Sequence, residues 1–355
     1  MSRYITARRM RLRALSLVLV TCFALLSCGS MPVADGSREI GMTVRLVDTD
    51  PATVTREFDL MASMHVSWVR ADFDWSAIEV NHGGFNWAYP DGIVKEASAR
   101  RMNVLPVLAY TPSWARPAAT TSHTPPSHAS DFAEFARAAA ARYAPLGVHT
   151  WEIWNEPNIN DFWQPAPDAN KYGELFRAAA ATIRGVDPTA TVLTGGLTRG
   201  SDTADGSRIS QTKYLEQLYA NGTAQEASAI AVHPYSFPWL PLTDTTPMVG
   251  GFNDVPALQQ VMKRHGDGGK KIWITEFGAP TGTASYAVTD NNQALSLVQA
   301  RRQNQQWSWA GPLIYFELRD AGTDRAVGDD NFGVVRRDLS LKPAGRALTK
   351  QRLWP

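Results

Sequence analysis

Two glutamates stand where apolar, strand-like runs give way to loops. Glu156 lies in the run WEIWNEPN at positions 151–158, and Glu276 lies in the run IWITEFG at positions 272–278. Burial disfavours the charged form of a carboxyl group, so neighbouring groups decide whether such a group is ionised. One protonated and one ionised carboxyl group are what cleavage of a glycosidic bond requires. Either glutamate taken alone is also compatible with a salt bridge or a loop cap.

The composition excludes several other kinds of protein. Of 355 residues, 35 are basic and 34 are acidic, so the charge gives no reason to expect a nucleic-acid partner. We find no phosphate-binding loop and no dinucleotide glycine pattern, and His123, His128 and Glu152 lack the spacing of metal ligands. We therefore expect no cofactor and no metal. Twelve tryptophans are enough to fill a core and to leave some on loops, where they would suit stacking on sugar rings.

The first 27 residues have the pattern of an export signal rather than of a folded domain. A basic start precedes the apolar stretch Ala14–Leu26, which is short for a membrane span. The sequence LLSC at positions 25–28 resembles a bacterial lipobox, in which the cysteine, here Cys28, carries a diacylglycerol. We expect a signal peptide over 1–27 and a lipidated tether over 28–39, with a plain signal peptide as the alternative. Cleavage before Cys28 would leave a single cysteine and no internal disulfide.

From residue 40 onward, strand-like and helix-like segments alternate eight times. Continuous apolar runs predict parallel strands covered on both faces, over 42–46, 66–73, 104–110, 149–154, 190–195, 229–233, 271–276 and 312–317. Apolar residues three and four positions apart predict helices over 54–65, 91–101, 130–143, 170–186, 210–221, 255–264, 291–307 and 342–352. Eight such units predict an α/β fold, a single (β/α)8 TIM barrel over 40–355, whose catalytic groups lie at the carboxyl ends of the strands.

The motifs that close the fourth and seventh expected strands resemble those of a known group of enzymes. WNEP at 154–157 and ITEFG at 274–278 are similar to the motifs of the retaining (β/α)8 glycoside hydrolases of clan A. The resemblance spans most of the chain after the signal and includes RADFDWSAIE at 70–79, HPY at 233–235 and NFG at 331–333. Family 39 is the nearest by these motifs, and a family 5-like assignment is the second choice.

The resemblance implies a role for each glutamate. It makes Glu156 the general acid/base and Glu276 the nucleophile, and it implies that the Tyr235 hydroxyl donates to Glu276. We expect Glu276 to be ionised and Glu156 to hold a proton in the free enzyme, because little beside Glu156 would stabilise its charge. His233, after an apolar run, would hydrogen-bond one of the two glutamates or be a satisfied residue at the barrel rim.

Two further polar residues have positions that suit the reacting groups. Asn155 would offer its amide to the sugar 2-hydroxyl, a contact that strengthens in the transition state. Arg70 ends the second expected strand, and a guanidinium there would hold the nucleophile ionised and orient it. A structural ion pair with Asp72 or Asp74 is the alternative for Arg70.

The loops that follow the strands supply candidates for sugar binding. Trp114, Trp163 and Trp239 are expected on the mouth side of the barrel, where each would stack on a sugar or simply pack in its loop. The eighth expected strand reads IYFELRD at 314–320 and lacks the tryptophan that the superfamily commonly has there. Glu317 or Asp320 is therefore expected to contact the substrate instead.

These observations favour one function and leave one alternative. We expect a monomeric retaining glycoside hydrolase, exported and anchored in the cell membrane by lipid at Cys28, facing the extracellular or periplasmic side. Loop aromatic residues and the export signal favour endo-action on an extracellular or cell-wall glycan, although the residues do not separate endo- from exo-action. The alternative is a surface lipoprotein that binds glycan without turnover. Such degenerate barrels usually lose a catalytic carboxylate, whereas this chain has both.

Overall fold

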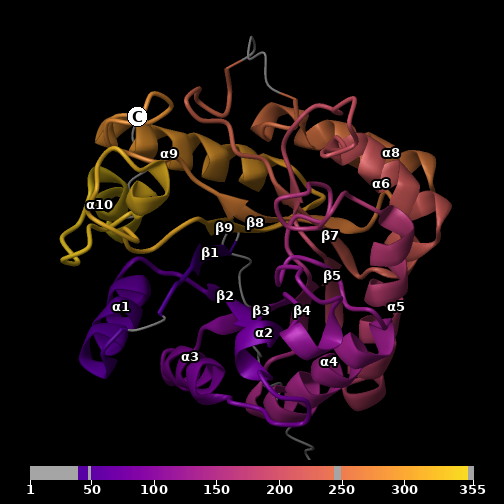
Figure 1. Ribbon diagram of the computed structural model, residues 1–355. Coiled ribbons are helices and arrows are strands. Elements are labelled where there is room, and N and C mark those ends of the chain that lie inside the picture. Colours follow the sequence, from indigo (N-terminus) through magenta and orange to yellow (C-terminus); the bar gives the residue numbers. More distant parts are fainter. Residues whose placement is uncertain (1–38, 47–48, 244–248, 351–355) are drawn as a thin grey trace, which may run out of the picture. The chain divides into compact units, whose positions relative to one another are not determined.

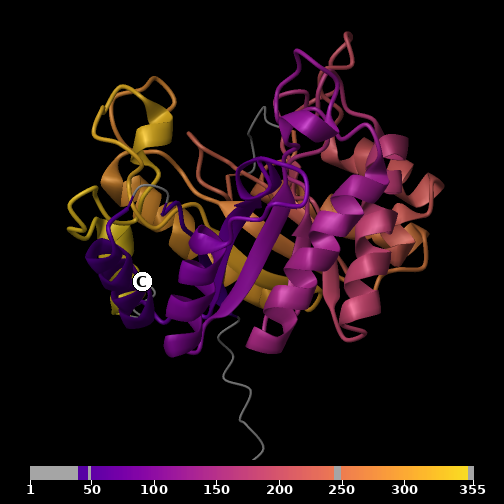
Figure 2. The same ribbon diagram turned by 60° about the horizontal axis from the view of Figure 1, so that its bottom comes forward.

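A ring of strands forms the centre of the chain, and helices surround it (Figures 1 and 2). The computed structural model describes residues 39–46, 49–243 and 249–350, which belong to one compact unit. All strands pair in parallel. They are β1 (Ile40–Thr43), β2 (Trp68–Asp74), β3 (Asn103–Ala109), β4 (Thr150–Ile153), β5 (Thr191–Thr194), β6 (Leu197–Thr198), β7 (Ala229–His233), β8 (Lys271–Phe277) and β9 (Ala310–Tyr315).

The strand order confirms the predicted barrel. The order is β5-β4-β3-β2-β1-β9-β8-β7-β6, and a pairing of β5 with β7 closes the ring. The fifth predicted strand, 190–195, corresponds to β5, and an unpredicted two-residue strand, β6, follows it; both pair with β7. Gly195 and Gly196 separate the two strands. A side chain at Gly195 would meet the Trp154 carbonyl group, and one at Gly196 would overlap the His233 ring.

The helices lie close to their predicted positions, with two short additions, α2 and α7. They are α1 (Pro51–Ser63), α2 (Trp75–Ile78), α3 (Ala88–Ala99), α4 (Ala129–Tyr143), α5 (Ala169–Val186), α6 (Gln211–Ala220), α7 (Thr223–Glu226), α8 (Val255–Arg264), α9 (Asp290–Gln306) and α10 (Pro343–Thr349). Side chains of Asp50, Asp168 and Thr289 accept hydrogen bonds from the first-turn N–H groups of α1, α5 and α9. No helix within the described ranges is long and apolar enough to cross a membrane.

Successive side chains of β2 point alternately toward the helix-facing core and toward the barrel interior. Val69, Ala71 and Phe73 are fully buried in the main core between strands and helices. Trp68 belongs instead to a small cluster inside the barrel, which consists of Trp68, Leu105, Leu193, Ala229, Ala231, Trp273 and Ile314. Because side chains on a strand alternate, Arg70 and Asp72 follow Trp68 on the inward face, one layer and two layers nearer the mouth.

A bulge near the end of β8 turns two successive side chains inward. Between Ile274 and Phe277 the strand advances three residues while β9 advances only two, from Leu313 to Tyr315. One extra residue therefore stands on the β8 side, and such a bulge redirects a side chain that would otherwise face outward. As a result, Thr275 and Glu276 both reach polar groups of the interior.

Candidate active site

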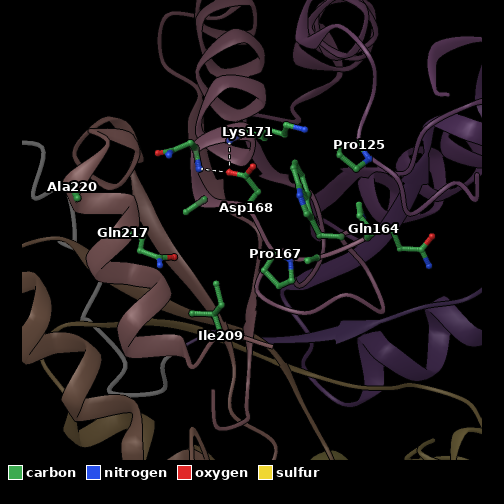
Figure 3. Close-up of a pocket in the computed structure, with 13 residues that line it drawn as sticks. Pro125, Gln164, Pro167, Asp168, Lys171, Ile209, Gln217 and Ala220 are labelled. Carbon is green, nitrogen blue, oxygen red and sulfur yellow. Dashed lines mark hydrogen bonds between the residues drawn. The ribbon is translucent and has the colours of Figure 1, made fainter. Parts of the chain in front are cut away.

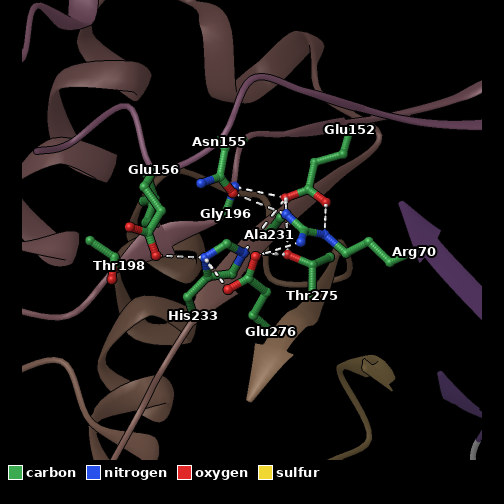
Figure 4. A network of polar contacts seen from close by, with 12 residues as sticks. Arg70, Glu152, Asn155, Glu156, Gly196, Thr198, Ala231, His233, Thr275 and Glu276 are labelled. Carbon is green, nitrogen blue, oxygen red and sulfur yellow. Dashed lines mark hydrogen bonds and ion pairs between the residues drawn. The ribbon is translucent and has the colours of Figure 1, made fainter. Parts of the chain in front are cut away.

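Glu156 stands on a strained turn after β4. Trp154 and Glu156 both have positive φ, +70° and +44°, a conformation that costs a non-glycine residue about 1–2 kcal/mol. The fully buried Trp154 holds the turn in place because its indole Nε1 donates to the Phe162 carbonyl oxygen at 2.7 Å. The turn aims the Glu156 carboxylate back over the barrel interior, where it meets His233 (Figure 4).

Glu276 is held by donors on both carboxylate oxygens. Arg70 Nη1 donates to Oε1 at 2.5 Å, and the Tyr235 hydroxyl donates to Oε2 at 2.5 Å. Burial by itself would raise the pKa of Glu276, but the charges of His233 and Arg70 and the hydrogen bond from Tyr235 lower it below the ordinary value. Glu276 is therefore a carboxylate at neutral pH, the state that the sequence predicts for it.

The two glutamates lie close together although 120 positions separate them in the sequence, from 156 to 276. A carboxylate oxygen of Glu156, a carboxylate oxygen of Glu276 and a ring nitrogen of His233 all lie within 4.8 Å of one another. Retaining glycosidases have carboxyl groups about 5–5.5 Å apart, whereas inverting ones need about 6.5–9.5 Å to admit a water molecule. The pair thus has the short spacing of a nucleophile and an acid/base that act on one anomeric carbon.

Arg70 organises the centre of the site from β2. Its fully buried guanidinium donates to Glu152 at 2.8 Å, to Asn155 Oδ1 at 3.1 Å and to Glu276 (Figure 4). No ion pair joins it to Asp72 or Asp74 among the described contacts, so the alternative reading of Arg70 is wrong. Because the Asn155 oxygen accepts from Arg70, the NH2 group of Asn155 is left to donate to a ligand.

Glu152 is a member of the network that the sequence analysis missed. It is fully buried in β4 and accepts hydrogen bonds from Arg70, from the Gly196 N–H group and from the Thr275 hydroxyl. Burial alone would raise its pKa, but the charge of Arg70, the His233 ring 3.8 Å away and the hydrogen bond from Arg70 lower it to about 2. An acidic residue in the middle of an apolar strand needs a buried cation as partner, and that signal was present in the run WEIW.

His233 connects the two carboxylates from the end of β7. Its Nδ1 lies 2.8 Å from Glu156 Oε1 and 3.6 Å from Glu276 Oε2, and its Nε2 lies 3.0 Å from the Thr275 hydroxyl. Burial would lower the pKa of His233, but the charge of Glu276, the nearby Glu152 carboxylate and the hydrogen bond with Glu156 raise it to about 9. His233 thus lies at hydrogen-bond distance from the Glu156 carboxyl group, one of the two alternatives expected for it, and a protonated Glu156 in the free enzyme stays a prediction.

The same three side chains are near enough to one another to hold a metal ion. The raised pKa of His233, about 9, favours the doubly protonated ring at neutral pH, so a metal ion would have to displace a proton to bind there. The arrangement therefore suits acid–base and nucleophilic chemistry better than binding of a cation.

Two acidic residues near the end of β9 are each paired with a cation. Glu317 is 1% exposed, and Arg45 donates to both of its oxygens at 2.6 and 2.8 Å. Asp320 is also buried, and Lys342 donates to it at 2.7 Å. Glu317 is thus already paired with the exposed Arg45 and Asp320 with the buried Lys342, so neither is a free acceptor, and contact of either with substrate stays a prediction. The half-buried Phe316 beside them packs edge-on against Tyr235 instead.

The three tryptophan candidates differ in exposure. Trp163 is 1% exposed and packs against Trp154 and Tyr172, so its predicted role in sugar stacking is wrong. Trp114 is half-buried, and its indole donates to the Glu79 carbonyl oxygen. Trp239 is 38% exposed on the loop after β7. Stacking on sugar stays a prediction for Trp114 and Trp239.

A cavity of about 580 Å³ lies between the loop after β4 and helix α6 (Figure 3). Its lining includes Gln164, Pro167, Lys171, Ile209 and Gln217 but neither catalytic candidate. Trp163, from the same loop, borders it. The cavity is thus a feature of the β4 loop and not the space between Glu156 and Glu276.

Comparison with known proteins identifies the chain's relatives. The family model described as cellulase (glycosyl hydrolase family 5) matches residues 38–311. A 65-residue stretch, 17% of this chain, is 42% identical to a beta-xylosidase of Geobacillus stearothermophilus but covers only 12% of that protein. Confirmation of the clan resemblance therefore comes chiefly from the family model and from the fold.

Solved structures share the fold at low identity. A family 39 glycoside hydrolase from the gut symbiont Bacteroides cellulosilyticus WH2 superposes with a TM-score of 0.71 at 21% identity, over 89% of this chain and 64% of that one. GH5_18 from Streptomyces cattleya, solved with GlcNAc, gives a TM-score of 0.62 at 16% identity, over 88% of this chain and 80% of that one. The chain thus spans less than two thirds of the family 39 relative. Both families expected from the motifs occur among the matches, and the family model is that of the second choice, family 5.

Proposed function

This chain belongs to the cellulase family, glycosyl hydrolase family 5, and from that premise we propose that it hydrolyses O-glycosidic bonds with retention of anomeric configuration. The observation that carries the proposal is the short spacing of Glu156 and Glu276, within 4.8 Å through one oxygen each. Relatives in families 5 and 39 support the reaction class. The roles of the individual residues are our inference from the contacts around them.

In the first step Glu276 attacks the anomeric carbon. Arg70 and Tyr235 orient the carboxylate and keep it ionised, so a lone pair points toward the substrate. Glu156 gives its proton to the glycosidic oxygen as the bond to the leaving group breaks. The Asn155 NH2 group donates to the sugar 2-hydroxyl as positive charge develops on the ring.

In the second step water releases the sugar. Glu156, now a carboxylate, takes a proton from water, and the oxygen attacks the anomeric carbon while the bond to Glu276 breaks. The His233 imidazolium donates to the Glu156 carboxylate in this state and so favours it between the two steps. Two inversions at one carbon leave the configuration of the substrate unchanged.

The test of the proposal is the configuration of the first product. We expect proton NMR during cleavage of a 4-nitrophenyl glycoside to show the product first as the same anomer as the substrate, before mutarotation. First appearance of the opposite anomer would contradict the two-step mechanism. Absence of hydrolysis over a broad panel of glycosides and polysaccharides would favour the alternative, a glycan-binding lipoprotein without turnover, and affinity electrophoresis on the same polysaccharides would then reveal binding.

We propose further that the substrate is a polysaccharide of the cell exterior or cell wall and that cleavage is internal. The support is the exposed Trp239 and the half-buried Trp114 on mouth loops, which suit stacking along a chain of sugars. Sizing of early products separates the two modes of action. Endo-action gives a ladder of oligosaccharides, whereas release of a single small sugar from the start would contradict it.

We also propose that lipid on Cys28 anchors the protein in the cell membrane. The support is the sequence LLSC at 25–28, and residues 1–38 lie outside the described part of the chain. Cys28→Ala is expected to move the protein from the membrane fraction to the soluble fraction or to block processing. Cys22→Ala is the matched control and should leave the distribution unchanged. Normal processing and membrane retention of Cys28→Ala would contradict the anchor.

A further inference from the structure

Asp72 is a carboxylate in the barrel mouth that the proposed reaction does not use. It lies two residues beyond Arg70 on the inward face of β2, which places it about 7 Å nearer the mouth. Its strand neighbours Ala71 and Phe73 are fully buried, yet Asp72 is exposed. Among the described residues, no side chain donates a hydrogen bond to Asp72 and no cation lies within ion-pair distance of it. Such a free carboxylate inside a polar site points to a ligand.

The surroundings of Asp72 form one wall of the mouth. On the neighbouring strand β1, Thr43 is in register with Arg70 and therefore points to the same face. The Thr43 hydroxyl is buried and also lacks a hydrogen-bond partner among the described residues. Arg45 follows on the same face, but Glu317 already binds its guanidinium, which lies 4.9 Å from the centre of the Phe316 ring. Among the described residues of this wall, Asp72 is thus the open acceptor, whereas the Thr43 hydroxyl is closed to solvent.

We propose that Asp72 binds hydroxyl groups of the sugar ring that Glu276 attacks and restricts the site to neutral sugars. A carboxylate accepts two hydrogen bonds, so it suits a pair of neighbouring hydroxyl groups. The same charge repels a uronic acid, because Arg45 is neutralised by Glu317 and offers no compensating free cation. This inference rests on the proposed hydrolase function and adds the class of sugar to it.

The charges around Asp72 also predict a pH dependence. Although the side chain opens to the mouth, the surrounding barrel walls desolvate the carboxyl group and raise the pKa of Asp72 to about 6, against the charge of Arg70, which lowers it. The negative charges of Glu276, Asp74 and Glu152 raise it further. The ionisable groups that face Asp72 are Arg70, Asp74, Glu276, Glu152, Arg45, Tyr89 and Tyr110. As pH falls through about 6, Asp72 takes up a proton, and kcat/KM for a neutral glycoside is expected to fall with it.

The experiment compares Asp72→Asn with the wild type on 4-nitrophenyl β-glucoside, mannoside, xyloside and glucuronide. On the best neutral substrate we expect kcat/KM to fall about 10- to 100-fold, the effect of losing a hydrogen bond to a charged group. The fall of kcat/KM as the pH drops through about 6 should be smaller in the variant than in the wild type. The ratio of kcat/KM for the neutral sugar to kcat/KM for the glucuronide should also fall, because the variant no longer repels the glucuronide carboxylate. Asp59→Asn, an exposed position on α1, is the control.

Several outcomes would overturn the inference. Unchanged kcat/KM in a folded Asp72→Asn variant would do so, as would an equal loss on every sugar with an unchanged pH profile. If the variant does not fold, the wild type still decides: we expect cleavage of the neutral sugar at least about 100-fold faster than of glucuronide, and equal rates would overturn the idea. Absence of wild-type hydrolysis both on this panel and on the polysaccharides would refute the proposed function itself, whereas activity that Glu276→Ala abolishes and Asp72→Asn leaves intact would refute this inference alone.

Discussion

Glu276→Ala is expected to lower kcat on a 4-nitrophenyl glycoside by at least about 10⁴-fold, because no group remains to attack the anomeric carbon. The cavity left by the side chain lies between Arg70 and Tyr235, two donors that suit a small anion. Added formate or azide should therefore restore part of the rate. The external nucleophile attacks only once, so the product should have the inverted configuration.

The control for Glu276→Ala is Glu134→Ala, which removes an exposed carboxylate from α4 and should keep wild-type kinetics. Thermal unfolding of both variants checks that the fold is intact. Near-normal turnover in Glu276→Ala, or rescue by azide with retained configuration, would contradict the assignment of the nucleophile.

The effect of Glu156→Ala on turnover is expected to depend on the leaving group of the substrate. For an alkyl glycoside, whose leaving group needs a proton, kcat should fall about 10²- to 10⁴-fold, the usual contribution of a general acid. For a dinitrophenyl glycoside, whose leaving group needs none, bond cleavage should proceed and the glycosyl-enzyme should accumulate. Azide should then speed turnover and give a product of retained configuration, because it attacks the intermediate on Glu276.

The contrast between the two variants is the decisive measurement. Azide products of opposite configuration from Glu276→Ala and Glu156→Ala would assign the two roles directly. A loss in Glu156→Ala that is the same for alkyl and dinitrophenyl leaving groups would contradict an acid role for Glu156. Intact-protein mass spectrometry of the quenched Glu156→Ala reaction should show one added sugar, and its absence would point to a direct displacement.

Local sequence was enough to predict the barrel and the position of the two glutamates at one rim of it. Apolar periodicity and capping act over neighbouring residues, so the alternation of strands and helices is visible without the fold. Both glutamates end apolar runs, and parallel strands in a closed barrel must bring such ends to one rim. The sequence also led us to expect contacts from Arg70 and Tyr235 to Glu276, and both residues lie at hydrogen-bond distance from it in the structure.

Tertiary structure alone decided which ionisable groups neutralise one another. Glu317 looked available at the end of β9, but Arg45, 272 positions away, occupies it. Glu152 looked unremarkable in β4, yet it shares Arg70 with Glu276, and His233 carries a charge because carboxylates from β4 and β8 surround it. The bulge in β8 that turns Thr275 and Glu276 inward has no signal in the run IWITEFG. Charge and orientation depend on groups brought together from distant parts of the chain, and no local pattern carries that information.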